Sequence, residues 1–541
     1  MKIVVLGGYG VFGSRLAELL VRDGETVVVV GRDRQKAEQQ AAKLGCEACA
    51  FDVHANPEAL GALAPDVVID AVGPFQAYGG DVYHLAKLCL EIGADYLDLS
   101  DSAQFTAGIE ELDDAARAAG RRVLSGVSSV PGLSSVVASE LTKDMHDIHL
   151  IEIAILPGNR APRGTSVMSS ILSQLGQPVK VWRGGRWQTQ RVWSDARRVV
   201  LAPGLVRTGH FIEVPDVRLF PNFFSARSVM FRAGMELSVL NRGMQIVAAV
   251  RRFWPFEITA GRLRLFQVVA QMLERFGTDR GGMRVDVIGR VGDDYLCRTW
   301  CLTAEAGEGP YIPAVAARAV VRNLRKIAPG ARAGLSEVSL YEMQKAFADL
   351  SVDAVQNAEV FTPHFQRAFG EDWSNLRFQS RYLHNVIDVS HFNGEAKISR
   401  GRSLPARLTA WFFGFPNEAE ACPVTVTKTR EAEGELWVRT FGAQRFQSRC
   451  APAPEPGRFR ERFGAFLFEV DLEVVDGEVT MPLRRGWVCG VPLPRWALPK
   501  SETREFVAEG RFNFDVSLRM PFGDALIVRY QGYLEPVSQT Q

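Results

Sequence analysis

The start of the chain contains the feature that most limits what it can fold into. An apolar run, Ile3 to Leu6, leads directly into Gly8-x-Gly10-x-x-Gly13, and leucines at helical spacing follow. This order of strand, glycine turn and helix is the context in which the glycine pattern binds a dinucleotide. Gly8 permits the tight turn, Gly10 lets a pyrophosphate approach the backbone, and Gly13 lets the helix pack on the strand. The pattern predicts an α/β domain with a Rossmann-type, doubly wound parallel sheet.

The second expected strand, residues 26–30, indicates which dinucleotide binds. It is followed by Arg32, Asp33 and Arg34. A site for NAD usually has a carboxylate at this strand end, whereas a guanidinium there pairs with the 2′-phosphate of NADP. Asp33 argues for NAD, but it lies one residue late and between two arginines. Two solvated arginines that open a helix are the alternative interpretation. We predict NADP(H) as the preferred cofactor, with NAD(H) left open.

Two further segments are expected to run beside the cofactor, because ligands of such sheets bind beyond the carboxyl ends of the strands. One is the turn at Gly73, which follows a strand at 67–72, and the other is the loop after the strand at 122–125. The predicted cofactor-binding residues are Gly7, Gly8, Gly10, Val11, Phe12, Gly13, Arg32, Arg34, Asp52, Gly73, Pro74, Phe75, Ser128 and Ser129.

Three residues near these strand ends are candidates for moving a proton: Tyr78, Asp98 and Asp101. Acid–base catalysis requires hydrogen-bond reach to the substrate and a suitable pKa, and the sequence supplies neither. Asp98 and Asp101 would have a purely structural role if they cap the helix that follows them. We expect no metal site, because Cys46 and Cys49 have no second pair or nearby histidine to complete one.

Several segments resemble the saccharopine-dehydrogenase-like family of NADP-dependent oxidoreductases over about residues 1–345. The segments that carry the resemblance are Gly7–Gly13, Gly73–Gly79, Ala94–Leu99, Ser125–Gly132 and Trp300–Pro313. The resemblance implies an enzyme that transfers hydride to or from a small or lipid-like substrate. Members include amino-acid-forming reductases, polyamine-pathway enzymes and a branch that reduces lipid-like or polyketide intermediates, so kinship alone does not select the substrate.

The chain is long enough for three domains. We expect a Rossmann NADP-binding domain at 1–147 and an α+β substrate or dimerisation domain at 148–350, whose end could return to the first domain. A β-rich domain of unknown function is expected at 355–541, because two-residue turn signals there join short alternating segments.

The β-rich tail resembles an uncharacterised domain that often follows saccharopine-dehydrogenase-like modules. The matching segments are Trp437–Phe441, Arg460–Gly464, Gly490–Pro494 and Arg529–Tyr533. We expect a curved antiparallel sheet around a helix, enclosing an apolar cavity. His384 and His391, expected on strands, either line that cavity or are simply hydrogen-bonded in the structure.

The expected substrate domain has two features that suggest ligands. Arg160 and Arg163 lie in a glycine- and proline-rich loop and would clamp an anion or remain solvated. Residues 233–276 mix apolar and aromatic residues with arginines, as in a helix at a membrane interface. A helical pair packed on the domain, or a homodimer seam, would show the same residues. The mixture inclines us toward a lipid-like substrate and peripheral membrane contact.

The composition of the chain and the distribution of its apolar residues argue against a nucleic-acid-binding, a membrane-spanning and a secreted protein. Lys plus Arg number 63 and Asp plus Glu 62, so no overall field favours nucleic acid. No apolar run reaches the roughly 18–20 residues that span a bilayer, and the chain opens into a core strand rather than a signal peptide. We therefore expect a cytoplasmic protein. A non-catalytic nucleotide-binding sensor or scaffold, and a lipid- or small-molecule-binding protein acting through its tail, are the alternatives to an oxidoreductase.

Overall fold

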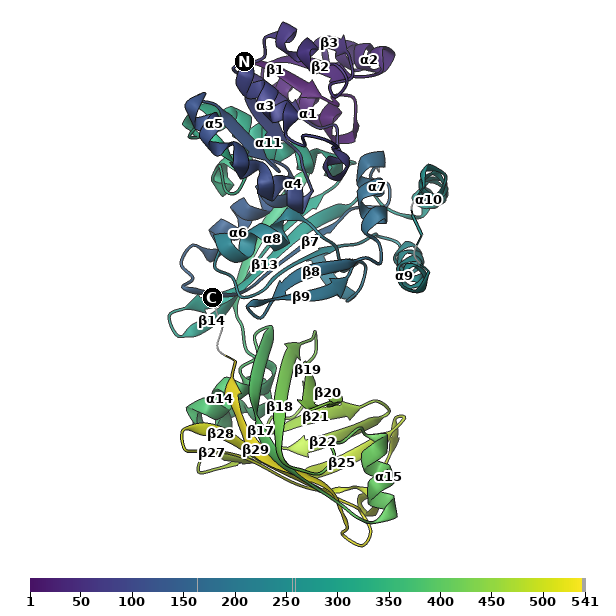
Figure 1. Ribbon diagram of the computed structural model, residues 1–541, viewed down its shortest axis with the longest axis vertical. Coiled ribbons are helices and arrows are strands. Elements are labelled where there is room, and N and C mark those ends of the chain that lie inside the picture. Colours follow the sequence, from purple (N-terminus) through teal and green to yellow (C-terminus); the bar gives the residue numbers. More distant parts are fainter. Residues whose placement is uncertain (163, 255, 258, 538–541) are drawn as a thin grey trace. The chain divides into compact units, whose positions relative to one another are not determined.

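The computed structural model describes residues 1–162, 164–254, 256–257 and 259–537 (Figure 1). The chain forms two compact units, Met1–Glu359 and Val360–Gln541, here called unit 1 and unit 2. The arrangement found, a Rossmann-type parallel sheet, an α/β region and a β-rich tail, is the predicted fold class, which is confirmed.

Seven parallel strands form the first sheet of the described chain, in the order β15-β6-β5-β4-β1-β2-β3. Four of the five β1 residues are fully buried, as expected for a parallel sheet that is covered on both faces. The third strand ends at Ala50, so Asp52 lies in the loop after it. The strands are β1 Lys2–Leu6, β2 Thr26–Gly31, β3 Glu47–Ala50, β4 Val67–Asp70, β5 Asp95–Asp98, β6 Arg122–Ser125 and β15 Gly330–Ala333.

Helices of ordinary length connect these strands. They are α1 Val11–Arg22, α2 Arg34–Leu44, α3 His84–Glu91, α4 Ala103–Gly108, α5 Asp113–Ala118, α6 Ser134–Thr142, α11 Ile312–Asn323 and α12 Leu340–Phe347. Short 3-10 segments occur at Pro57–Leu63, Phe75–Ala77, Ile109–Leu112, Glu274–Phe276, Gly309–Tyr311, Leu324–Lys326, Gly370–Asn375 and Arg495–Ala497.

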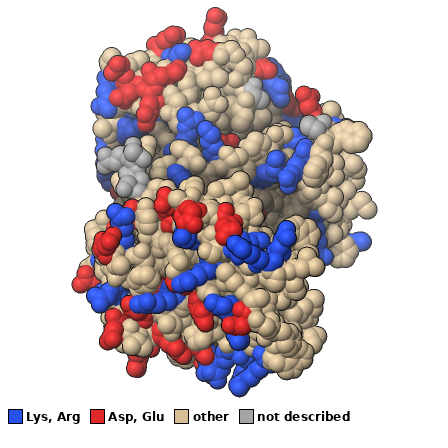
Figure 2. All heavy atoms as spheres, turned by 60° about the horizontal axis from the view of Figure 1, so that its bottom comes forward, with Lys and Arg blue, Asp and Glu red and all other residues tan. Residues whose placement is uncertain are grey.

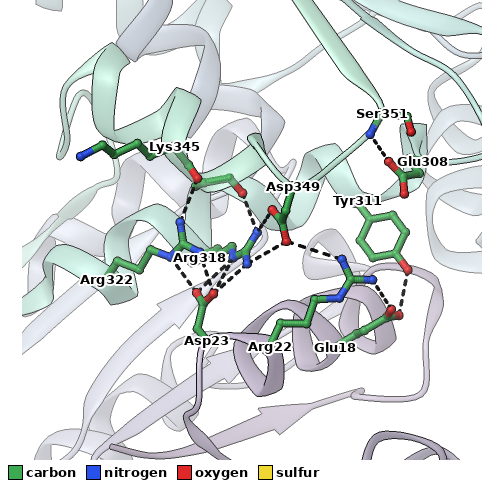
Figure 3. Close-up of polar contacts among 11 residues, drawn as sticks. Glu18, Arg22, Asp23, Glu308, Tyr311, Arg318, Arg322, Lys345, Asp349 and Ser351 are labelled. Carbon is green, nitrogen blue, oxygen red and sulfur yellow. Dashed lines mark hydrogen bonds and ion pairs between the residues drawn. The ribbon is translucent and has the colours of Figure 1, made fainter.

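Late in unit 1 the chain returns to the first sheet, where β15 pairs with β6. An ionic cluster around the buried Arg318 fixes this return (Figure 3). Arg318 of α11 is 2% exposed and donates hydrogen bonds to Asp23, next to α1, and to Asp349, after α12. Arg322 donates to Asp23 as well. These bidentate contacts satisfy the buried guanidinium and hold α11 against α1.

The second sheet of unit 1 has a main path in the order β10-β11-β12-β7-β13-β14-β16, with β8 paired to β12 and β9 to β8. Its strands are β7 Asp147–Leu156, β8 Pro178–Arg183, β9 Arg186–Arg191, β10 Arg197–Ala202, β11 Leu205–Phe211, β12 Val229–Ala233, β13 Gly281–Val291, β14 Asp294–Ala304 and β16 Val352–Val360. Its helices are α7 Thr165–Gln174, α8 Pro215–Phe223, α9 Ser238–Phe253 and α10 Ala260–Leu273.

Unit 2 is built on one strongly curved antiparallel sheet, for which the described residues supply thirteen strands (Figure 1). These are β17 Val389–Arg400, β18 Ala419–Arg430, β19 Glu435–Phe441, β20 Gln444–Pro452, β21 Arg458–Phe463, β22 Phe466–Asp471, β23 Glu473–Val475, β24 Glu478–Thr480, β25 Leu483–Val488, β26 Val491–Pro492, β27 Lys500–Ala508, β28 Arg511–Arg519 and β29 Leu526–Pro536.

Helices α13 His364–Phe369, α14 Phe378–His384 and α15 Leu404–Phe412 complete unit 2. Phe365 of α13 and Ala410 of α15 are buried in its two apolar cores. The expectation that both histidines lie on strands is wrong for His384, which ends α14, whereas His391 lies on β17. Short apolar helices and strands share the same composition, and tertiary packing decides between them.

The surface carries both signs of charge in mixture. Figure 2 shows Lys and Arg side chains interspersed with Asp and Glu over the face in view, as the near balance of charges predicts. Among the described residues, no helix is long and apolar enough to cross a membrane.

Candidate functional site

The glycine turn between β1 and α1 has the geometry of a pyrophosphate cradle. Gly7 has a φ of +70°, which favours glycine, and its carbonyl accepts a hydrogen bond from Gly10 N at 2.8 Å. A Cβ on Gly13 would lie 2.3 Å from that carbonyl oxygen, so Gly13 is required for packing. Gly10 precedes the first turn of α1 with an ordinary φ of −70°. A Cβ there would meet only Gly7 O, at 3.0 Å, so its lack of a side chain leaves open the space in front of the helix N-terminus.

The three charged residues that follow β2 differ in their contacts. Asp33 caps α2, accepting a hydrogen bond from Lys36 N at 3.1 Å, and its own N–H donates to the Tyr9 hydroxyl at 3.1 Å. Arg32 and Arg34 are exposed, and within the described chain neither makes a hydrogen bond or an ion pair. The carboxylate that argued for NAD is therefore engaged by its own helix, while both guanidinium groups remain available.

Tyr78 lies against a buried carboxylate that the sequence analysis did not identify. Its hydroxyl donates to Asp70, at 3.1 Å to Oδ2, and the Tyr96 hydroxyl donates to the same oxygen at 3.4 Å. Burial raises the pKa of Asp70, and burial together with this carboxylate raises that of Tyr78. Asp70 ends a fully apolar strand, and a carboxylate in that position is the signal that could have found it.

Asp98 links two strand ends. Its carboxylate accepts hydrogen bonds from Gly126 N at 2.8 Å, Ser100 N at 2.9 Å and the Ser125 hydroxyl at 3.0 Å. Burial raises the pKa of Asp98 to about 7, although the hydrogen bonds oppose this. Asp98 therefore fixes the loop after β6, which carries Ser128 and Ser129, relative to β5.

Asp101 occupies a different environment, at the edge of a cavity. It accepts a hydrogen bond from Gln76 Nε2 at 3.3 Å and another from the Ser170 hydroxyl at 3.5 Å. Burial raises its pKa. The suggestion that Asp98 or Asp101 caps the next helix is wrong, because Ser102 caps α4 by accepting a hydrogen bond from Phe105 N at 3.4 Å. Ser102 is the residue with extended backbone angles directly before the first turn.

This cavity has a volume of about 580 Å³ and lies within unit 1. Phe12 of the glycine turn, Asp101 and Ser129 line one side of it. Thus the structure brings together predicted residues from three separate strand ends, while Tyr78 and Asp98 lie outside the lining. The other walls come mainly from α7, α9, α10 and the second sheet, and they are mostly apolar, including Met168, Ile171, Leu172, Trp193, Phe231, Leu240, Met244, Phe266, Val269 and Leu273.

The segment 233–276, for which a helix at a membrane interface and a packed helical pair were both considered, contains α9 and α10, and both helices line this cavity. Arg251 of α9 is buried, and its Nη1 donates to the carbonyls of Leu172, Ser173 and Leu175 at 2.7–3.1 Å. It therefore caps the end of α7 and does not point to a lipid surface. Arg160 is exposed and lies outside the cavity lining, and Arg163 lies outside the described residues.

The other predicted cofactor residues lie around the same edge of the sheet. Phe75 is buried and packs on Tyr78 and Phe105, with ring centroids 5.1 and 5.2 Å apart, and Ser128 and Ser129 are buried. Asp52 accepts a hydrogen bond from His54 N at 3.0 Å. These residues surround the glycine turn from β3 to β6, which is the region where a doubly wound sheet holds a dinucleotide.

Comparison with known proteins supports this interpretation of the front of the chain. Residues 3–124 match the saccharopine dehydrogenase NADP binding domain, and residues 376–534 match a domain of unknown function, DUF4166. The prediction of a saccharopine-dehydrogenase-like module followed by an uncharacterised domain is therefore confirmed. The domain match supports an NAD(P)-dependent oxidoreductase with a nicotinamide dinucleotide as cofactor. No curated protein matches the chain.

One solved structure has the fold of unit 1. The chain is similar to apo saccharopine dehydrogenase (L-Glu forming) from Saccharomyces cerevisiae, with 16% identity and a TM-score of 0.50, covering 66% of this chain and 99% of that one. A gentamicin-biosynthesis protein, GenD2, in complex with NAD has 16% identity and a TM-score of 0.28 over 55% of this chain and 71% of that one. At these identities the first likeness establishes the fold alone.

Proposed function

We propose that the protein is an NADP(H)-dependent oxidoreductase that acts on an apolar carbonyl or enoyl compound bound in the cavity of unit 1. The observation that carries the proposal is the lining of this cavity, which begins at the glycine turn and continues along the apolar faces of α7, α9 and α10. The nicotinamide cofactor would supply the hydride. A lysine-pathway substrate fits less well, because it carries several carboxylates and, among the described residues, no lysine or arginine lines the cavity to bind them.

In this proposal some residues would bind the cofactor and another would deliver a proton. The glycine turn and the N-terminus of α1 would hold the pyrophosphate, and Ser128 and Ser129 would adjoin the nicotinamide. Asp101 lines the cavity proposed for the substrate, and burial raises its pKa, which keeps a proton on the carboxyl closer to neutral pH. Asp101 is therefore the group that we propose for proton delivery to the substrate oxygen or carbon.

The unengaged Arg32 supports a preference for NADPH. We expect wild-type protein to bind NADPH at least about tenfold more tightly than NADH, because a charge-assisted contact contributes about 1.5–3 kcal/mol. Arg32→Ala should lose most of this preference without weakening NADH binding. Fluorescence titration of both cofactors measures the effect, and Lys43→Ala, an exposed cation at the other end of α2, is the control. Equal affinities of the wild type for the two cofactors would contradict the assignment.

Filling the cavity should affect apolar substrates selectively. Ala270 of α10 is buried and lines the cavity, so Ala270→Phe should raise the KM of an apolar enal about tenfold or more, with NADPH affinity unchanged. Steady-state kinetics with NADPH and decenal measure this effect. Ala249→Phe on the exposed side of α9 is the control. If the two variants behave alike with every active substrate, the cavity is not the substrate site.

The outer faces of α9 and α10 support peripheral contact with an anionic lipid surface, which we propose as the source of the substrate. Phe253 and Trp254 are 80% and 77% exposed, and α9 and α10 also expose Ile246, Leu265 and Met272. A concentration of exposed apolar side chains on two neighbouring helices is typical of an interaction site. The exposed arginines of this described segment, Arg242, Arg252, Arg262, Arg264 and Arg275, outnumber its exposed carboxylates, Glu257 and Glu274. This balance of charge favours anionic headgroups.

Flotation with vesicles tests this contact. We expect the protein to float with vesicles that contain phosphatidylglycerol, and a Phe253→Ser, Trp254→Ser double variant to float about tenfold less, because two aromatic anchors are lost. Phe378→Ser removes an equally exposed phenylalanine from unit 2 and should change nothing. Equal flotation of all three proteins, or none by the wild type, would refute the proposal.

A further inference from the structure

Unit 2 contains a second cavity, of about 180 Å³, inside its curved sheet. Its lining is largely apolar, and its aromatic residues include Phe413, Phe441, Phe446, Phe468, Phe514 and Tyr530. The lining also includes four charged side chains, Lys428, Arg439, Glu461 and Glu505. Charged groups rarely occur in so apolar a place without a function or a tight pairing.

Lys428 is the least expected of the four. Alternate residues of β18 face the interior, and this alternation puts Lys428 on the same buried face as Val424 and Val426. The side chain is 1% exposed, and its Nζ lies 3.7 Å from the ring centre of Trp437, its cross-strand partner. Nζ donates a hydrogen bond to Leu383 O at 3.0 Å. Among the described residues, no carboxylate forms an ion pair with this amine.

Lys428 Nζ contacts His384, and His384 in turn contacts Glu505. The ring of His384 is fully buried, and its Nε2 lies 2.7 Å from Glu505 Oε2. Because a carboxylate accepts only, Nε2 carries the proton, and the bare Nδ1 faces Lys428 Nζ at 3.5 Å. Burial and Lys428 lower the pKa of His384, so the imidazole is neutral and can accept a proton. Amine, base and orienting carboxylate thus form the arrangement that activates a nucleophile.

The apolar environment of Lys428 also favours the neutral form of its amine. Burial lowers the pKa of Lys428 to about 8, although Glu435 and Glu505 oppose the shift. At mildly alkaline pH about half of these amines are neutral, against about one in a hundred or fewer of ordinary surface lysines. A neutral lysine in an apolar pocket is the form that attacks carbonyl groups.

The local charges indicate which ligand fits. Arg439 already donates to the Ser448 hydroxyl at 2.8 Å and to Glu461 at 3.2 Å, so it is not available for an anionic ligand. A carboxylate ligand would bring a further negative charge beside Glu461 and Glu505 in a region of low dielectric constant. A carbonyl ligand adds no charge. An apolar cavity of about 150 Å³ is known to bind benzene, so this cavity suits a ligand slightly larger than that.

We propose that this cavity binds a small apolar aldehyde or ketone, about the size of benzaldehyde, and that the Lys428 amine condenses with its carbonyl group. The Nζ lone pair attacks the carbonyl carbon, and His384 Nδ1 takes a proton from the nitrogen and returns it to the former carbonyl oxygen, so that His384 ends the step neutral. The resulting carbinolamine then loses water and leaves an imine between the ligand and Nζ. The net change is one C=O bond and one primary amine converted to one C=N bond and one water. The site rests on unit 2 alone and is independent of the dinucleotide site.

Reductive trapping on the full-length protein tests the proposal. The protein at pH 8 is treated with one equivalent of benzaldehyde and then with sodium borohydride, which converts an imine to a stable amine. Peptide mass mapping should place the benzyl group on Lys428 at least about tenfold more than on any other lysine, because about half of its amines are neutral at this pH and very few of the surface lysines are. Lys428→Met should abolish this label, and Lys397→Met, which removes an exposed lysine of β17, should not.

One further variant and two further ligands distinguish the role of His384 from that of Lys428. His384→Asn keeps the amine but removes the base, and labelling of Lys428 in the folded variant should become about tenfold slower. Benzoate and benzyl alcohol, added in excess, should compete poorly, because neither forms an imine. Labels spread over surface lysines, no label at all, or protection by benzoate stronger than by other aldehydes would overturn the proposal. The mapping uses wild-type protein, so the test stands even if a variant fails to fold.

Discussion

Gly10→Val should abolish binding of NADPH while leaving the protein folded. Gly10 has backbone angles that any residue adopts, and a Cβ there approaches only Gly7 O, at 3.0 Å. The added methyl groups would instead occupy the space in front of the α1 N-terminus, where the pyrophosphate must lie. We expect affinity to fall by at least about a hundredfold, which corresponds to about 2.7 kcal/mol. Fluorescence titration measures the loss, and thermal unfolding reports the fold.

The neighbouring glycine provides the matched control for this test. Gly13→Ala would place its Cβ 2.3 Å from Gly7 O, so this variant should lose stability as well as binding. The two glycines of one motif therefore separate a binding role from a packing role. A Gly10→Val protein that unfolds normally and still binds NADPH with wild-type affinity would show that the pyrophosphate does not lie at this turn.

Asp101→Asn should lower kcat by about a hundredfold or more, because the amide retains the shape of the carboxyl but cannot deliver its proton. Binding of NADPH should not change. Burial raises the pKa of Asp101, so the protonated, active form should be lost as the pH rises through that pKa, and the wild-type rate should fall there. Steady-state kinetics as a function of pH check both statements.

A second carboxylate of the same cavity is the control for Asp101. Asp279 also lines the cavity, and Asp279→Asn should leave kcat within about threefold of wild type, because it removes a charge but no proposed proton donor. An Asp101→Asn enzyme with full kcat and an unchanged pH profile would exclude Asp101 as the acid.

The sequence allowed the front of the chain to be predicted because its signals are local. A glycine turn requires particular residues at fixed spacing, and β1 is an almost continuous apolar run, so both are visible without tertiary structure. Asp33 also has a local signal, because its position directly before a helix is typical of a cap, but from the sequence it was weighed only as an argument for NAD. The strand ends that carry Gly73 and Ser128 followed from the alternation of strands and helices.

The residues that were not predictable depend on contacts across the fold. Whether Tyr78 or Asp101 faces the cavity is decided by α7, which brings Ser170 to Asp101 and lies about seventy positions later in the chain. Likewise, Arg251 in a basic and apolar segment is indistinguishable from its neighbours until α7 ends against it. Lys428 had a usable signal, since it continues the inward alternation of Val424 and Val426.

The central claim is that this chain passes hydride between NADPH and an apolar substrate in the cavity of unit 1. The most direct measurement incubates the protein with NADPH deuterated at C4 and with decanal, decenal, or 2-oxoglutarate plus lysine, and then weighs the products by mass spectrometry. We expect deuterium in the product of decanal or decenal, and none when Gly10→Val replaces the wild type. Deuterium only in the product formed from 2-oxoglutarate and lysine, or in no product although NADPH binds, would contradict the account.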